Sequence, residues 1–104
     1  MGLSMDDRGR ALENKWAHDE ELRFKVEARR NRLVGTWAAG QKGLSGDAVE
    51  QFILGVIAAD FQEAGDEDVF RKLRSELDLS VPDNVIRAQM ADSLKQAVTE
   101  LTAA

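Results

Sequence analysis

The stretch VEQFILGVIAADF, residues 49–61, carries the clearest helical pattern in this chain. Its apolar residues recur at spacings of three and four, which places them on one face of an α-helix. We expect a helix over about residues 45–64, with Ser45 as its N-cap and Gly65 as its stop. The apolar face that we expect at the centre of the core consists of Val49, Phe52, Ile53, Val56, Ile57 and Phe61.

A second pattern precedes this helix, over about residues 18–40. Four of its apolar residues fall within one narrow arc of a helix, which predicts that this arc faces the core. Gly40 and Gly43 are expected to supply the positive φ angles that end the helix and turn the chain. The arc consists of Leu22, Val26, Leu33 and Trp37.

Two further helices are expected over about residues 66–79 and 81–102. The first opens with an acidic run, which is favourable at a helix N-terminus, and the second has Pro82 in its first turn, where proline is tolerated. No segment has the alternating pattern of a strand, so the predicted fold class is all-α, a small four-helix bundle-like domain over residues 18–104. The apolar faces of these two helices are Val69, Phe70, Leu73 and Leu77, and Ile86, Met90, Leu94, Ala97 and Leu101.

The first 17 residues differ from the rest of the chain. Opposite charges alternate there around Gly9, and too few apolar residues are present to offset the entropy of ordering a chain. We therefore expect residues 1–17 to be a mobile N-terminal segment that becomes helical only when it is bound. The apolar anchors that it offers are Leu3, Met5, Ala11 and Leu12.

The helix over residues 18–40 also has an apolar residue on its other side. Phe24 lies nearly opposite Leu22, beside Ala17 and Ala28. One interpretation is a central helix covered by several neighbours. The other is a docking face, to which Leu12 and Trp16 would also contribute, with Trp16 as its principal anchor.

Composition limits the class of function. A chain of 104 residues fits one domain, and the absence of cysteine excludes disulfides and thiol chemistry. A net charge of −5 argues against nucleic acid as a partner and favours a protein. No apolar run is long enough to span a bilayer, so we expect a cytoplasmic protein without direct membrane insertion.

Residues that could carry chemistry are few. His18 has no partner for catalysis or zinc binding, although as a histidine it could respond to pH between the segment and the helices. The acidic stretch DFQEAGDED, residues 60–68, lacks the calcium-loop spacing and is expected to be a solvated turn between helices. We expect no catalytic residues, no metal and no cofactor, and hence a protein that is not an enzyme.

A basic cluster, Arg29, Arg30 and Arg32, is the one feature suggestive of nucleic-acid binding. Carboxylates on the same helix would repel a phosphate backbone, so we expect these arginines to pair with the acidic remainder of the chain or with an acidic protein.

Two blocks of the sequence resemble a known family. They are WAHDEELRFKVEARRNRLVGTWAA, residues 16–39, and ADFQEAGDEDVFRKLRSEL, residues 59–77, and in order and spacing they are similar to the alphaproteobacterial ATPase inhibitor zeta subunit family. The resemblance implies a four-helix inhibitor whose N-terminal segment enters a catalytic α/β interface of the F1 sector of the F1Fo-ATP synthase and blocks ATP hydrolysis. It implies the F1 alpha, beta and gamma subunits as partners, and a location peripheral to the inner membrane through the ATP synthase.

The resemblance also places the partner-binding residues. The family's inhibitory segment corresponds to about residues 5–15 and continues to Phe24, with Gly9 and Trp16 departing from the family's usual pattern. The alternative function is a non-inhibitory helical adaptor, or a module that binds a small ligand such as a nucleotide. The predicted partner-binding residues are Met5, Asp6, Arg8, Arg10, Leu12, Lys15, Trp16, His18 and Phe24.

Overall fold

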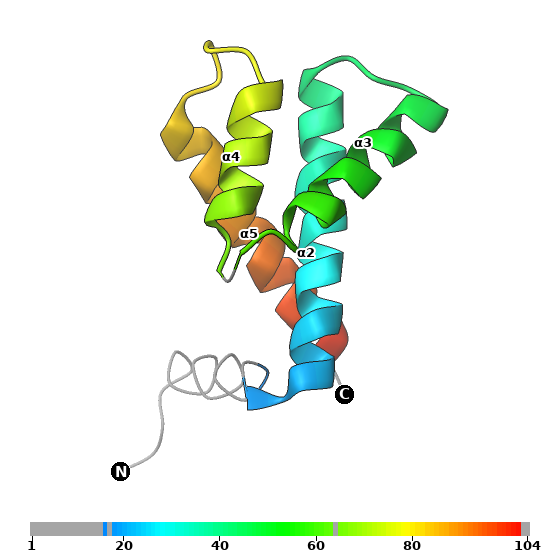
Figure 1. The fold of residues 1–104 in the computed structure, drawn as a ribbon, viewed down its shortest axis with the longest axis vertical. Coiled ribbons are helices and arrows are strands. Elements are labelled where there is room, and N and C mark those ends of the chain that lie inside the picture. Colours follow the sequence, from blue (N-terminus) through cyan, green and yellow to red (C-terminus); the bar gives the residue numbers. More distant parts are fainter. Residues whose placement is uncertain (1–15, 17, 64, 103–104) are drawn as a thin grey trace.

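The computed structural model describes residue 16 and residues 18–63 and 65–102 (Figure 1). These residues form the helices α2 (Glu20–Gln41), α3 (Asp47–Ala59), α4 (Glu67–Glu76) and α5 (Asp83–Thr102). No strand occurs among them, so the predicted all-α, four-helix fold is confirmed. The division of the chain at residue 17 stays a prediction, because residues 1–15 and residue 17 lie outside the described part.

Helix α2 is the axis of the molecule (Figure 1). It packs against α5 and α3, while α4 packs against α3 and α5, which closes a ring of four helices. Beyond this ring, the N-terminal half of α2 and the C-terminal half of α5 extend side by side to the end of the molecule at which the C-terminus lies. The described part of the chain therefore has a four-helix end and a two-helix end.

Each end has its own hydrophobic cluster. The four-helix end is built from fully or almost fully buried residues of every helix, and the two-helix end from Val26, Ala97 and Val98. Trp16, Leu22, Leu33 and Leu94 pack against this smaller cluster. The larger cluster contains Val34, Ala38, Ala39, Phe52, Val56, Val69, Leu73, Leu77, Ile86 and Met90.

The ends of α3 differ from the prediction. Gly46, with φ of 60°, precedes the first helical residue, and Ser45 is not the N-cap. The helix ends at Ala59 with Asp60 as C-cap, well before Gly65. Phe61 therefore leaves the helical register and is 69% exposed, so its predicted place in the core is wrong.

The C-terminal end of α2 also differs from the prediction. Gly40 is helical, and the positive φ belongs to Gly43, at 72°, after the last helical residue Gln41. Gly40 was therefore wrongly predicted to leave the helix, whereas the prediction for Gly43 is confirmed.

The buried face of α2 is broader than the predicted arc. Contacts with α3 and α5 on two sides bury the small residues Gly35, Ala38 and Ala39 together with the polar Arg30 and Asn31. Leu22, Leu33 and Trp37 are only partly buried. From Val26 onward α2 is thus a central helix, and among the large hydrophobic residues of α2 only Phe24 is exposed.

Candidate partner-binding surface

The start of α2 is fixed by its N-cap. The Asp19 carboxylate accepts a hydrogen bond from the Leu22 amide at 2.9 Å, and Glu20 and Glu21 add negative charge to the first turn. Both features stabilise a helix N-terminus. Helix α2 therefore begins at Glu20, between the predicted partner-binding residues His18 and Phe24.

The structure describes three of the nine predicted partner-binding residues, and it separates them. Trp16 is half-buried against the cluster of the two-helix end, and His18 is exposed. Phe24 is 59% exposed on the far side of α2. The other six, Met5, Asp6, Arg8, Arg10, Leu12 and Lys15, lie outside the described residues.

Phe24 has one aromatic neighbour, the ring of Phe61. The two ring centroids lie 6.3 Å apart with an interplanar angle of 37°, within the range of a favourable aromatic pair. The other two of the chain's four phenylalanines are covered. Phe52 is 9% exposed, and Phe70 is partly buried with the Arg87 guanidinium 3.8 Å from its ring centroid. Of the four phenylalanines, only Phe24 and Phe61 are therefore exposed.

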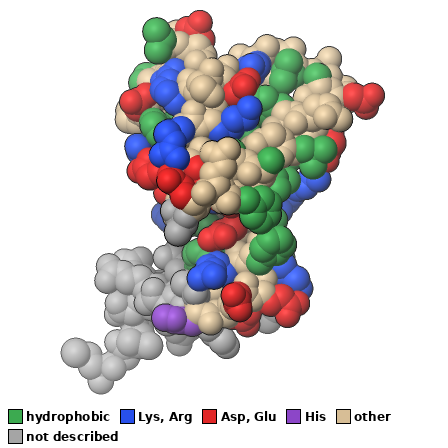
Figure 2. Space-filling model, viewed as in Figure 1, with side chains coloured by type: hydrophobic (Ala, Val, Ile, Leu, Met, Phe, Trp, Pro, Cys, Tyr) green, Lys and Arg blue, Asp and Glu red, His purple; other side chains and the backbone are tan. Residues whose placement is uncertain are grey.

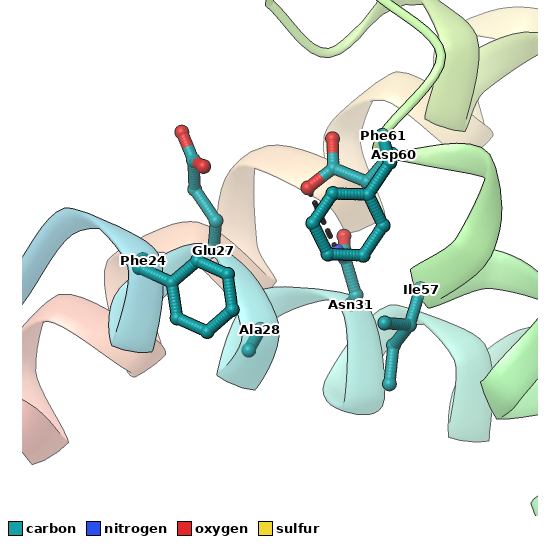
Figure 3. Close-up of a pocket in the computed structure, with 7 residues that line it drawn as sticks. All are labelled: Phe24, Glu27, Ala28, Asn31, Ile57, Asp60 and Phe61. Atoms are coloured by element: carbon teal, nitrogen blue, oxygen red, sulfur yellow. Dashed lines mark hydrogen bonds between the residues drawn. The ribbon is translucent and has the colours of Figure 1, made fainter. Parts of the chain in front are cut away.

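A shallow hollow lies between the two rings (Figure 3). Both rings border it, and the side chains of Asn31 and Asp60 meet in its floor. Figure 2 shows hydrophobic side chains gathered on this side of the molecule. Leu54, on the same helix as Ile57, is 45% exposed. We call this surface the Phe24–Phe61 face; it comprises Phe24, Glu27, Ala28, Asn31, Ile57, Asp60 and Phe61.

A polar network fixes the floor of this face. The Asn31 amide nitrogen donates to Asp60 at 3.0 Å, and its oxygen accepts from Arg30 Nε at 2.8 Å. Arg30 is 3% exposed, and its guanidinium lies 3.5 Å from the Asp60 carboxylate. The network ties the end of α3 to α2, and so holds Phe61 beside Phe24. Neither Asn31 nor Phe61 was predicted from the sequence as a residue of this surface.

Glu27 lies at the edge of the hollow. Burial raises the pKa of its carboxyl, and the negative charge of Asp60 raises it further, while Arg30 and Arg23 act in the opposite direction. Within the described part of the chain, Glu27 makes no hydrogen bond or ion pair of its own. A carboxylate in this position can accept a hydrogen bond from a cationic group.

The basic cluster pairs within the molecule, as the sequence predicted. Arg29 bonds Glu100 of α5 at 2.6 Å, and Arg32 bonds Glu50 of α3 at 2.8 Å. These bonds lower the pKa of both carboxyls. The guanidinium groups therefore orient α2 against its neighbours.

The described residues contain no group of three or more histidine and carboxylate side chains placed to hold a metal ion. Among the described helices, none combines the length and apolar character needed to cross a membrane.

Fold and surface together define a class: a small helical protein with an exposed aromatic surface of the kind that is used in protein contacts. The family model described as ATPase inhibitor subunit zeta matches residues 2–100. The chain belongs to this family, and the resemblance inferred from its two sequence blocks is confirmed. Its family is thus one of ATPase inhibitor subunits, which makes a regulatory role the expectation. No curated protein matches the chain.

Proposed function

We propose that this protein inhibits the F1 sector of the F1Fo-ATP synthase by inserting residues 1–17 at a catalytic α/β interface. The observation that carries the proposal is the family match, which begins at residue 2 and so includes the N-terminal segment as well as the helices. The protein acts by occupying the interface and performs no catalysis itself.

The distribution of apolar residues supports a division of labour. The described helices bury a core to which all four contribute, whereas the N-terminal segment is rich in charge and poor in apolar anchors. A segment of this kind folds when a partner supplies the missing apolar surface. The partners are the F1 alpha, beta and gamma subunits, and the protein lies on the cytoplasmic side, peripheral to the inner membrane.

The test is ATP hydrolysis by the purified cognate F1 complex, titrated with the full chain and with a chain that lacks residues 1–15. The full chain should suppress hydrolysis. The shortened chain should not, and its thermal transition should stay within a few degrees of that of the full chain, because the removed residues carry little apolar surface.

Two outcomes would contradict the proposal. A full chain without effect on its own F1 complex would favour the helical adaptor or the small-ligand module. A shortened chain that inhibits as well as the full chain would place the inhibitory surface on the helices.

A further inference from the structure

The exposed aromatic pair is not accounted for by the fold. Phe24 is 59% exposed and Phe61 is 69% exposed, so most of the apolar area of each ring contributes nothing to folding. Contiguous apolar area of this kind on a small protein marks a contact site. Here Ile57 lines the hollow, and Leu54, which is 45% exposed, lies one helical turn before Ile57 on α3.

The surface is also held in place. Asp60, adjacent to Phe61, is bound by the buried Asn31 and Arg30, so the Phe61 ring is carried by a turn that is anchored to α2. Preorganised aromatic side chains lose little conformational freedom on binding, which favours their use as anchors.

Charge indicates the chemistry of the occupant. The lining of the face has two carboxylates, Glu27 and Asp60, and no lysine or arginine. Asp60 already has partners, whereas Glu27 has none among the described residues. A second copy of the chain would bring like charges together, which is unfavourable. A partner with an apolar side chain beside a lysine or arginine complements the face.

Geometry indicates the form of the occupant. Helix α2, the end of α3 and the turn that follows α3 provide the face, and no strand edge is available in the described part of the chain for main-chain pairing. Recognition of a helix by such a surface relies on side chains spaced by three or four residues. Phe24 also lies one turn into the helix that follows the inhibitory segment, so a partner that receives this segment lies close to Phe61.

We propose that the Phe24–Phe61 face docks on a helix of an F1 subunit, which places an aliphatic or aromatic side chain against the two rings and a lysine or arginine against Glu27. This inference rests on the proposed function and adds a second contact to it. Docking of the helices α2 to α5 on F1 then increases the local concentration of the N-terminal segment at the catalytic interface. Loss of the body contact should weaken binding without lowering the maximal inhibition.

Phe61→Ala tests the contact, because Phe61 lies outside the segment proposed to insert. The full chain, Phe61→Ala and the control Leu79→Ala are compared for F1 binding and for inhibition of ATP hydrolysis. Leu79 is 87% exposed and lies between α4 and α5. Phe61→Ala should raise the concentration for half-inhibition at least about tenfold with unchanged maximal inhibition, as is usual for an interface anchor. Leu79→Ala should stay within about twofold, and the thermal transitions of all three should agree within a few degrees.

Glu27→Gln tests the charge. This variant should raise the concentration for half-inhibition by about three- to tenfold. It should also reduce the dependence of F1 binding on salt, because an ion pair at the interface is lost. An unchanged salt dependence would contradict the cationic partner.

The remaining outcomes separate this inference from the proposed function. If the full chain inhibits and Phe61→Ala inhibits at the same concentration, the second contact is wrong and the proposed function stands. If the full chain neither binds nor inhibits F1, both are wrong. A dimer in sedimentation that Phe61→Ala dissociates would assign the face to a second copy. If the free Phe61→Ala variant changes the amide signals of residues 1–15 as well as those around residue 61, the face would be assigned to the chain's own segment.

Discussion

Glu27 shows how one residue can be unfavourable for the fold and useful at a surface. Its carboxyl is partly buried near Asp60, and burial followed by that negative charge raises its pKa. A group whose pKa is higher in the folded state stabilises the protein while it is protonated. That contribution is complete below the pKa of the unfolded chain and is lost as the pH rises through the folded value.

Glu27→Gln should therefore stabilise the protein at neutral pH, because the amide avoids burying a charge beside Asp60. The difference in free energy of unfolding between the variant and the natural chain should shrink as the pH falls below the ordinary carboxyl value of 4.5, where both side chains are neutral. Urea unfolding across this pH range measures it. If the free energy of unfolding of the variant, relative to that of the natural chain, were lower at neutral pH than in acid, the raised pKa assigned to Glu27 would be contradicted.

Asn31 and Arg30 show what the sequence could not reveal at the scale of a residue. They are 1% and 3% exposed, yet no periodicity of apolar residues marks a polar residue as buried. Their burial depends on Asp60, which is brought to them from the end of α3. The available signal was the position of Arg30 and Asn31 on a helix that is apolar on two sides. This signal indicates burial only when the end of α3, which carries Asp60, is known to lie against α2.

At the scale of the element, the apolar patterns predicted most of the buried residues of α3 and α4, but both helices end earlier than predicted, α4 at Glu76 rather than near residue 79. Val69, Leu73 and Leu77 are buried as expected, and so are Phe52, Ile53 and Val56. Phe61 was misplaced because a spacing of four is informative only while the helix continues, and α3 ends at Ala59. Helix ends depend on caps and on long-range bonds such as that of Asp60, and so they were the weakest part of the prediction.

Two glycines at the end of α2, Gly40 and Gly43, should respond in opposite directions to the same substitution by alanine. A Cβ at either Gly40 or Gly43 would meet nothing within 4 Å, but only Gly43 has a positive φ, of 72°. Gly40→Ala should raise the free energy of unfolding by about 0.5 to 1 kcal/mol, because alanine favours a helix and loses less entropy on folding. Gly43→Ala should lower it by about 1 to 2 kcal/mol, because of the left-handed backbone.

Chemical denaturation of both variants tests this pair. Stabilisation by Gly43→Ala would contradict the assigned turn, and destabilisation by Gly40→Ala would contradict the helical assignment of that residue.

At the scale of the whole molecule, the two clusters differ in how many elements support them. The four-helix end is closed by contacts that link α2, α3, α4 and α5 in a ring, whereas at the two-helix end α2 and α5 are the only described helices that face one another, around Val26 and Val98. Trp16 covers this smaller cluster. The two-helix end is therefore expected to open locally at a lower free energy than the rest.

The location of Trp16 affects how its role in inhibition can be tested. Trp16 was predicted from the sequence as an interface anchor, and the structure shows it half-buried against the body. Trp16→Ala should expose part of the smaller cluster and lower the local opening free energy there by about 1 to 2 kcal/mol, since a fully buried side chain contributes about 1.5 to 3 kcal/mol. Amide exchange near Val98 should accelerate about tenfold, while that near Val56 should not change.

The pattern of exchange decides what a loss of inhibition in Trp16→Ala means. If exchange near Val98 accelerates, the tryptophan acts at least in part by holding the start of α2 against α5, and Phe24→Ala becomes the cleaner probe because Phe24 is 59% exposed. If inhibition falls while exchange stays the same at both ends, Trp16 acts through the partner alone. Acceleration of equal size near Val56 and Val98 would instead show that the two ends unfold as one unit, against the division inferred from the helix contacts.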